Sequence, residues 1–470
     1  MRVCSREISQ CIIEVMKLFP RLPVSNRTRA IVIFIITTIV ISSSFYQNSW
    51  KMVDGNFYQD WRDVFDELVI GRLAKSQVDG MLSAGGLLLI GDTDNYDLPS
   101  RTARHQTDMY FQAGKFDIYW TYKSTSGLEG LVFSFFDWIT DFEPQTNILL
   151  FYLGTSLVSG ATLSLILCWV WSEFGFTAYI LGAISVAFSP WLQLMGGSLY
   201  WQLWSLYLPF GLVLFTLTYF KGQGNYRHST MRLVVLLGVL IKVLFTGFEF
   251  ITTSLVSLTV PFVYFMIRDN WHGKLFMKRL GDAVIFSGLA VLLGLFILLI
   301  QISSETGGYV GAYSYIADAL NRRAVGNPAE YSGLIAESLD SSRLQVLITY
   351  LLGPAYGVGD GFTGGGNENS ISHLLLIVVF FIVGVILLWV VSVSDQFTKD
   401  RKAVALLVTS WYSILAPLSW LVVFKAHAYI HVDLDYFVWQ LPFLMLGFAL
   451  VGYSISALFV YLNGDTSSGK

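Results

Sequence analysis

The sequence predicts an all-α integral membrane protein with about ten transmembrane helices. Hydrophobic residues make up 54% of the 470 residues and charged residues only 13%, whereas soluble domains carry about 25% charged residues. The apolar residues gather in runs of roughly 17–25, the length that crosses a bilayer as a helix. Because a soluble core could not cover this much apolar side chain, lipid is expected to surround much of the chain. The net charge of −3 argues against a nucleic-acid partner.

The candidate transmembrane helices follow one another along almost the whole chain. They are 30–46, 146–171, 176–188, 203–219, 233–248, 251–267, 283–302, 371–393, 403–424 and 437–462. The third run is short and could continue to Leu194, and a tight turn joins the fifth and sixth. Residues 1–29 are then expected to form an N-terminal segment and residues 30–470 a polytopic membrane domain.

Lys and Arg residues predict the orientation. They are concentrated before residue 30 and again after the fourth, sixth and eighth runs. Since basic loops stay in the cytosol, both termini are expected there. The first run could instead be a cleaved signal peptide, but its long basic flank favours an uncleaved anchor. Cysteine pairs and glycosylation sequons are absent from the predicted outer loops, which favours a bacterial inner membrane.

Two long loops, 47–145 and 303–370, should face outward. The first is rich in aromatic residues, which disordered segments lack. Within it, residues 59–75 carry apolar residues at helical spacing and predict an amphipathic helix at the membrane surface, and residues 130–142 predict a second. The second loop carries Arg322 and Arg323, and its glycine-rich tail 357–366 lacks the Gly-Lys-Ser/Thr of a P-loop, which favours a flexible flap.

The helix predicted over 59–75 carries a cluster of acidic residues opposite its apolar stripe. They are Asp63, Asp66 and Glu67. Such a cluster can be a solvated helix face. Alternatively, it can hold a carboxylate over a cavity at membrane level, as a general base or a metal ligand. A divalent metal is compatible with this chemistry but is not required by it.

Three further segments between the runs carry polar or aromatic side chains. Near Tyr200 and Trp201, Pro190 and two glycines predict either a simple turn or the lining of a cavity, where the aromatic rings could stack on sugar. Glu249 ends the fifth run about two turns above Lys242, and the two could form a link to a cavity or a purely structural pair.

The last of these segments, 425–435, combines Lys425, His427 and His431 with two aspartates. The histidines are four residues apart and would share a helical face. A zinc site would need the glutamate partner of the metalloprotease pattern, which is missing. Phosphate binding by the lysine and the histidines is favoured over a merely solvated loop.

The whole layout resembles the GT-C class of membrane glycosyltransferases, with one span, a long outer loop bearing an acidic motif, and then a many-span bundle. The segments 66–86, 247–251 and 425–442 are similar to parts of bacterial proteins of this kind. In that class the first outer loop supplies the catalytic carboxylate, and the matching residues here are Asp63, Asp66 and Glu67, with Asp66 the first choice. The motifs are short, and no WWD-type motif of oligosaccharyltransferases is present.

The resemblance implies a transferase that uses a polyprenyl-phosphate sugar as donor and a lipid-linked or surface glycan as acceptor. Direct displacement would invert the anomeric centre. Cations would stabilise the phosphate that leaves, and the candidates are Arg322, Arg323, Lys425, His427 and His431. The alternative is a transporter or flippase, which would share the many spans. Transporters often contain internal repeats, however, and no repeat is visible in this sequence.

Overall fold

The computed structural model describes residues 24–83, 86–91, 103–116, 118–140, 142–357, 370–393 and 401–464. Within these ranges, nine helices are long and apolar enough to span a membrane, and counting one bent helix pair as a span gives ten. Shorter helices accompany them, and the strands of the described ranges form only two short two-stranded sheets. The chain is therefore an all-α integral membrane protein, as the sequence predicts.

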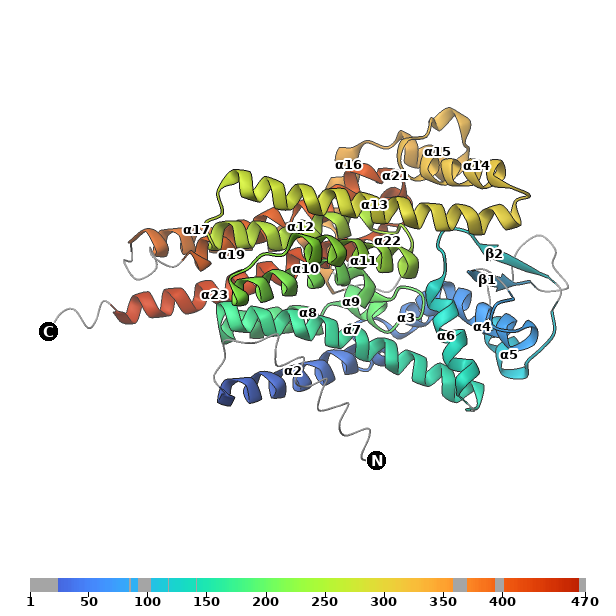
Figure 1. Cartoon of the computed structure of the whole chain (residues 1–470), viewed down its shortest axis with the longest axis horizontal. Coiled ribbons are helices and arrows are strands. Elements are labelled where there is room, and N and C mark those ends of the chain that lie inside the picture. The colour runs from blue at the N-terminus through green and yellow to red at the C-terminus, as the bar shows by residue number, and fades with distance from the viewer. Residues whose placement is uncertain are drawn as a thin grey trace.

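The spanning helices run side by side along the long axis of the molecule (Figure 1). They are α2 (Val24–Phe45), α7 (Pro144–Phe174), α10 (Leu203–Gln223), α11 (His228–Thr246), α12 (Ile251–Arg268), α13 (Gly273–Glu305), α17 (His373–Val393), α19 (Lys402–Tyr412) with α20 (Leu415–Val423), and α23 (Phe443–Gly464). Large apolar side chains on the outside of the bundle, such as Leu292 at 63% and Phe381 at 58% exposure, fit a lipid surrounding.

The predicted third span is broken at Pro190. Helix α8 (Phe176–Ala187) is followed by α9 (Pro190–Gly196) at an angle of 67°. A twelve-residue helix such as α8 reaches about 18 Å, less than the roughly 30 Å of a hydrocarbon core. Residues of α9 and of the turn behind it are buried, so protein rather than lipid covers this irregular backbone.

The predicted tenth span begins six residues too early. Residues Tyr436–Gln440 form a buried 3-10 helix, η4, and α23 starts only at Phe443. Pro442 lacks a backbone N–H, which favours a helix start at this point and not an uninterrupted helix. Before η4, the chain forms the short helices α21 (Lys425–Ile430) and α22 (Val432–Asp435).

The first long loop folds into a small layered unit. Its elements are η1 (Tyr46–Asn48), α3 (Gly55–Phe65), α4 (Glu67–Asp79), β1 (Leu87–Ile90), α5 (Ala103–Gln112), β2 (Tyr119–Tyr122) and α6 (Leu128–Ile139), with β1 antiparallel to β2. The helix predicted over 59–75 is in fact two helices that meet at Asp66. Helix α4 is buried along most of its length under α5, α6 and β1, so it does not lie free on the membrane surface. The predicted second amphipathic helix corresponds to α6.

The second long loop is mostly helical, and the flap interpretation does not describe it as a whole. Its elements are α14 (Tyr309–Leu320), the π-helical turn η2 (Asn321–Val325), η3 (Pro328–Glu330), α15 (Gly333–Asp340), α16 (Arg343–Leu352), and the pair β3 (Pro354–Tyr356) and β4 (Ile371–Ser372). Beyond Gly357, the glycine-rich tail predicted as a flap lies outside the described residues. Both long loops gather toward one end of the bundle, whereas α2 begins and α23 ends at the other (Figure 1).

Candidate functional site

Glu249 occupies the tight turn between α11 and α12. Lys242, a buried residue of α11, donates hydrogen bonds to the main-chain oxygens of Gly247, at 2.8 Å, and of Glu249. The predicted link between Lys242 and Glu249 therefore exists, but it runs through the backbone and not through the carboxylate. With the lysine holding the turn, the Glu249 carboxylate is free to contact other elements.

The Glu249 carboxylate joins two segments that are distant in sequence. Its Oε1 lies 2.9 Å from Nη1 of Arg323 in η2, and its Oε2 lies 3.4 Å from Nε2 of His427 in α21. Nδ1 of His427 is 3.2 Å from Oδ2 of Asp435, which also accepts a 2.6 Å hydrogen bond from the indole of Trp420. We call these five residues, Glu249, Arg323, His427, Asp435 and Trp420, the Glu249 cluster.

Burial and charge act against each other in this cluster. Burial alone would raise the pKa of Glu249, but Arg323 and His427 lower it to about 2, so this carboxylate is ionised. Burial disfavours protonation of His427, yet Asp435 and Glu249 outweigh it and raise the pKa of that imidazole. Neighbouring His431, with ring centroids 4.5 Å apart, has its pKa lowered to about 4 by burial and by His427, which favours the neutral ring.

Asp66 holds a turn whose Tyr200, together with Tyr122, lies within electrostatic range of Glu249. Its Oδ1 accepts hydrogen bonds from Oγ of Ser198, at 2.6 Å, and from the backbone N–H of Tyr200, at 3.2 Å. The phenol of Tyr200 in turn donates to the phenol of Tyr122, at 3.2 Å. Burial raises the pKa of Asp66, although Arg62, 3.6 Å away, opposes the shift. Asp66 thus anchors the turn that carries Tyr200.

The structure brings together only part of the predicted site. Glu249, Arg323, His427, His431 and Tyr200 converge as described.

Other predicted residues lie elsewhere. Asp63 accepts a 2.6 Å hydrogen bond from Gln59 at the surface of α3. Arg322 pairs with Asp318 on an exposed face, at 2.8 Å. Lys425 donates to the main-chain oxygen of Leu339, at 2.6 Å, where it caps the end of α15. A lysine engaged in this way does not face the Glu249 cluster, so its predicted part in a common phosphate site is not supported by the geometry.

Two predicted residues have mainly structural surroundings. Trp201 is 2% exposed and packs against Phe65, Tyr200 and Phe250. Its ring faces are therefore occupied by protein and are not open for a sugar to stack on. Glu67 is buried in α4, because that helix is enclosed on all sides instead of presenting a solvated face.

An apolar groove of about 280 Å³ opens beside the cluster, and we call it the α13 groove. Lys123, Ser124 and Arg323 supply its polar groups, and Arg323 and Trp420 belong to both the groove and the cluster. Its other walls are apolar or aromatic side chains of α12, α13, α14 and α20, such as Leu295, Leu298 and Ile316, together with Phe248 before α12 and Phe424 after α20. The groove thus combines a lipid-like wall with two cations at one place.

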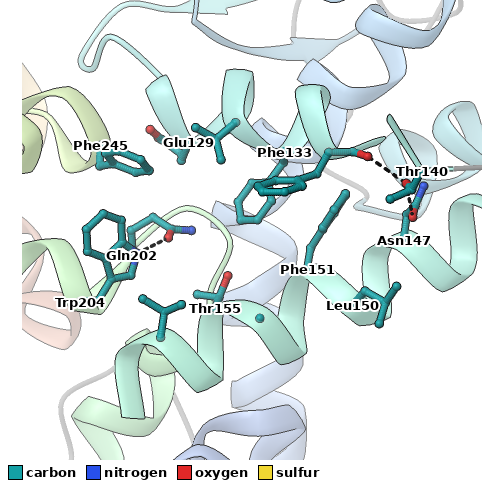
Figure 2. Close-up of a pocket in the computed structure, with 14 residues that line it drawn as sticks. Glu129, Phe133, Thr140, Asn147, Leu150, Phe151, Thr155, Gln202, Trp204 and Phe245 are labelled. Atoms are coloured by element: carbon teal, nitrogen blue, oxygen red, sulfur yellow. Dashed lines mark hydrogen bonds between the residues drawn. The ribbon is translucent and has the colours of Figure 1, made fainter. Parts of the chain in front are cut away.

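A second groove, of about 430 Å³, lies between α6, α7 and the ends of α10 and α11, and we call it the α7 groove. Figure 2 shows Glu129 of α6 on one wall and Gln202 and Trp204 on the opposite wall, with Phe133 and Phe151 between the helices. Sequence reasoning missed Glu129, Lys123 and Tyr122. An acidic residue such as Glu129 is common in the first turn of a helix. No sequence pattern around Lys123 or Tyr122 indicates that they lie near distant segments.

The described ranges contain no group of three or more His, Cys, Asp or Glu side chains placed to hold a metal ion. Comparison with known proteins found no matching family model, no significant match among curated proteins and none among solved structures.

Proposed function

We propose that the protein is a membrane glycosyltransferase that moves a sugar from a polyprenyl-phosphate donor to a glycan or lipid acceptor. One observation carries the proposal. The α13 groove places Lys123 and Arg323 at the edge of an apolar channel, next to the buried carboxylate of Glu249. We further propose that the end of the bundle bearing both long loops faces outward, in a bacterial inner membrane with cytosolic termini.

The apolar and charged parts of the donor match the apolar walls and the two cations of the α13 groove. Its polyprenyl tail is apolar, and its phosphate is an anion that guanidinium and ammonium groups bind well. Nη2 of Arg323 also lies 3.4 Å from Oγ of Ser124, so the guanidinium is held between the hydroxyl and Glu249. In this proposal Glu249 is a positioning residue, because it orients Arg323 and does not touch the phosphate itself.

In the proposed reaction, a hydroxyl oxygen of the acceptor attacks the anomeric carbon as the bond from that carbon to the phosphate oxygen breaks. The bonding electrons leave with the polyprenyl phosphate, whose charge Arg323 and Lys123 stabilise. The hydroxyl proton passes to a carboxylate, and the anomeric centre is inverted. Within the acidic motif, Asp66 remains the first candidate for this base. Its carboxyl lies at the buried turn that carries Tyr200, whereas Asp63 contacts Gln59 at the surface. No step of this reaction requires a metal ion, and participation of a metal ion is not excluded.

Binding of the leaving group tests the donor site. The full chain would be placed in phosphatidylcholine nanodiscs, and binding of undecaprenyl phosphate followed by native mass spectrometry. Losing a charge-assisted hydrogen bond costs about 1.5–3 kcal/mol, or roughly 10- to 100-fold in affinity. We expect this loss for Arg323→Gln and a smaller one for Lys123→Gln, because the ammonium group of Lys123 is also near Glu305, at 3.9 Å. Arg322→Gln is the matched control, because its neighbouring guanidinium pairs with Asp318 instead.

Chemistry is tested separately from binding. Proteoliposomes would receive undecaprenyl-phosphate sugars, and release of undecaprenyl phosphate would be measured, together with the surface glycans and lipids of a deletion strain and its parent. Transfer predicts bond cleavage and a glycan that loses one sugar in the deletion strain. A flippase would move the same donor across the bilayer with its sugar–phosphate bond intact, and that result would reject the proposal.

A further inference from the structure

Glu129 is a buried acid for which the described chain provides no partner. It lies in the first turn of α6, is 1% exposed, and neither carboxylate oxygen has a hydrogen-bond partner among the described residues. Burying a carboxyl group without a hydrogen bond is costly, and native proteins seldom leave such a group unsatisfied. A group other than the described residues is therefore expected to satisfy this carboxyl, and a ligand in the adjoining groove can do so.

Glu129 lies on the wall of the α7 groove. Across from it, Gln202 is already satisfied, since its amide donates to the Leu199 oxygen at 2.7 Å and accepts from the Trp204 indole at 2.7 Å (Figure 2). On the Glu129 side of the groove, the carboxyl of Glu129 is thus a polar group available to a ligand.

The rest of the α7 groove is mostly apolar and open on the outside of the bundle. Phe136, Leu150 and Val158 line it and are 46%, 43% and 48% exposed. They lie on α6 and on the spanning helix α7, so a molecule already in the bilayer can enter between these two helices. An aliphatic chain fits such walls, because its methylenes exchange contacts with neighbouring lipid chains for dispersion contacts with apolar side chains.

The polar end of the α7 groove is close to the rest of the site. Tyr200 is within electrostatic range of Tyr122, Glu249 and Glu129, so the Glu129 carboxyl lies near this tyrosine. Phe245 lines the α7 groove and Phe248 the α13 groove, so the two grooves reach the α11–α12 turn from different sides. A molecule in each groove would bring its head group toward the same region.

We infer that the α7 groove binds the acceptor, as a membrane lipid whose aliphatic chain lies between α6 and α7 and whose head group offers a hydroxyl to Glu129. Binding of this lipid does not depend on the proposed function. Only its role as the acceptor of the sugar does. A hydroxyl suits the site better than an ammonium group does. Burial raises the pKa of Glu129 well above its usual value, and the neutral carboxyl both donates to a hydroxyl and accepts from it.

The test uses two photoreactive probes on the full chain in phosphatidylcholine nanodiscs, a lipid without hydroxyl donors. One probe is a dodecyl maltoside with a diazirine in its chain, and the other has the same chain on methyl-capped tetraethylene glycol, which lacks hydroxyls. Glu129→Leu replaces the buried acid by an apolar side chain of similar size, and we expect the variant to fold because no buried hydrogen bond to another side chain is lost. Gly154→Phe fills the groove, because a Cβ at Gly154 meets nothing within 4 Å. Gly288→Phe on the exposed side of α13, where a Cβ also meets nothing within 4 Å, is the control.

Labelling of α6 and α7 peptides by the maltoside is expected to fall about 5- to 10-fold in Glu129→Leu, the loss of one hydrogen bond, while labelling by the capped probe stays unchanged. Gly154→Phe should lower both, and Gly288→Phe neither. Equal labelling in wild type and Gly154→Phe, or an equal effect of Glu129→Leu on both probes, would overturn the inference. If labelling follows the expected pattern but no sugar is transferred, the lipid site stands and the proposed function fails. If transfer occurs and Gly154→Phe leaves the KM for the acceptor unchanged, the acceptor assignment alone fails.

Discussion

The carboxylate of Glu249 lies 2.9 Å from the guanidinium of Arg323, and this contact joins the turn between two spanning helices to a π-helical turn in the second long loop. The glutamate is almost fully buried, and Arg323 is about one quarter exposed at 27%. An ion pair of this kind fixes a guanidinium in space while leaving part of it accessible. Because the pair connects separate segments, its loss should affect both stability and ligand binding.

Replacement of Glu249 by Gln should lower stability by about 1.5–3 kcal/mol, the value for a charge-assisted hydrogen bond. The amide keeps the volume but leaves Arg323 and His427 without their anion. Thermal unfolding of the purified chain in detergent would measure the loss, with Arg322→Gln, next to the partner residue Arg323 in η2, as the control. A Glu249→Gln variant as stable as wild type would show that the pair contributes nothing net.

The same residue predicts a dependence on pH. The folded-state pKa of Glu249 is about 2, below its ordinary 4.5, so its stabilisation is present above pH 4.5 and is lost as the pH falls toward 2. The difference in Tm between wild type and Glu249→Gln should therefore shrink as the pH is lowered through this range. A difference that is constant or grows on acidification would contradict the assigned charge state.

Asp66 and Asp63 should respond differently to replacement by Asn. Asp66 accepts two hydrogen bonds from the Ser198–Tyr200 turn, whereas Asp63 contacts Gln59 at the surface. Asp66→Asn is expected to lower the rate of sugar transfer at least tenfold, in the range of a general base, with undecaprenyl phosphate affinity retained. Asp63→Asn should stay within about twofold in both assays, as surface changes usually do. The reverse ranking would remove Asp66 from the reaction.

Lys425 offers a test of where phosphate does not bind. Its ammonium group caps the main-chain oxygens of Leu339 and Ser341. Lys425→Met should thus lower Tm, since buried carbonyl acceptors lose a donor, but leave undecaprenyl phosphate affinity within twofold. A loss of affinity comparable to that of Arg323→Gln would restore Lys425 to the phosphate site.

Close packing of the spans can be tested at Gly452 in α23. A Cβ there would lie 2.4 Å from the main-chain oxygen of Thr177 and 2.6 Å from Cα of Ala178. Gly452→Ala should destabilise the chain by about 1–3 kcal/mol through overpacking, whereas Gly288→Ala, which meets no atom within 4 Å, should not. Equal melting temperatures for the two variants would mean that α8 and α23 can separate at little cost.

The fold class was predictable because lipid imposes a strong and local rule on sequence. A spanning helix must be apolar over a fixed length, and this signal located most spans to within about six residues. Helix α13 is an exception, because it begins at Gly273, ten residues before the predicted run at 283, with a polar and basic first part. The signal failed at Pro190 and Pro442. At both places an apolar run continues although the helix cannot, because hydropathy records burial and not backbone hydrogen bonding.

The site was less predictable because its members meet only through tertiary packing. Glu249 and His427 were visible as polar residues in apolar surroundings, and the structure joins them. Nothing in the sequence distinguishes Arg323 from Arg322, yet one turns inward to Glu249 and the other outward to Asp318. Adjacent residues of a helical turn point in different directions, so which of the two faces inward depends on how η2 packs against the α11–α12 turn. Glu129 resembles any acid that starts a helix until the surrounding walls are known.

The exposed lining of the α7 groove determines which concentration of ligand controls its occupancy. A ligand that enters sideways from the bilayer is already dissolved in it, so occupancy follows the mole fraction of that ligand among the lipids and not its amount per volume of water. Adding inert phosphatidylcholine at a fixed bulk dose should therefore empty the groove, a surface-dilution behaviour that an entrance from water would not produce.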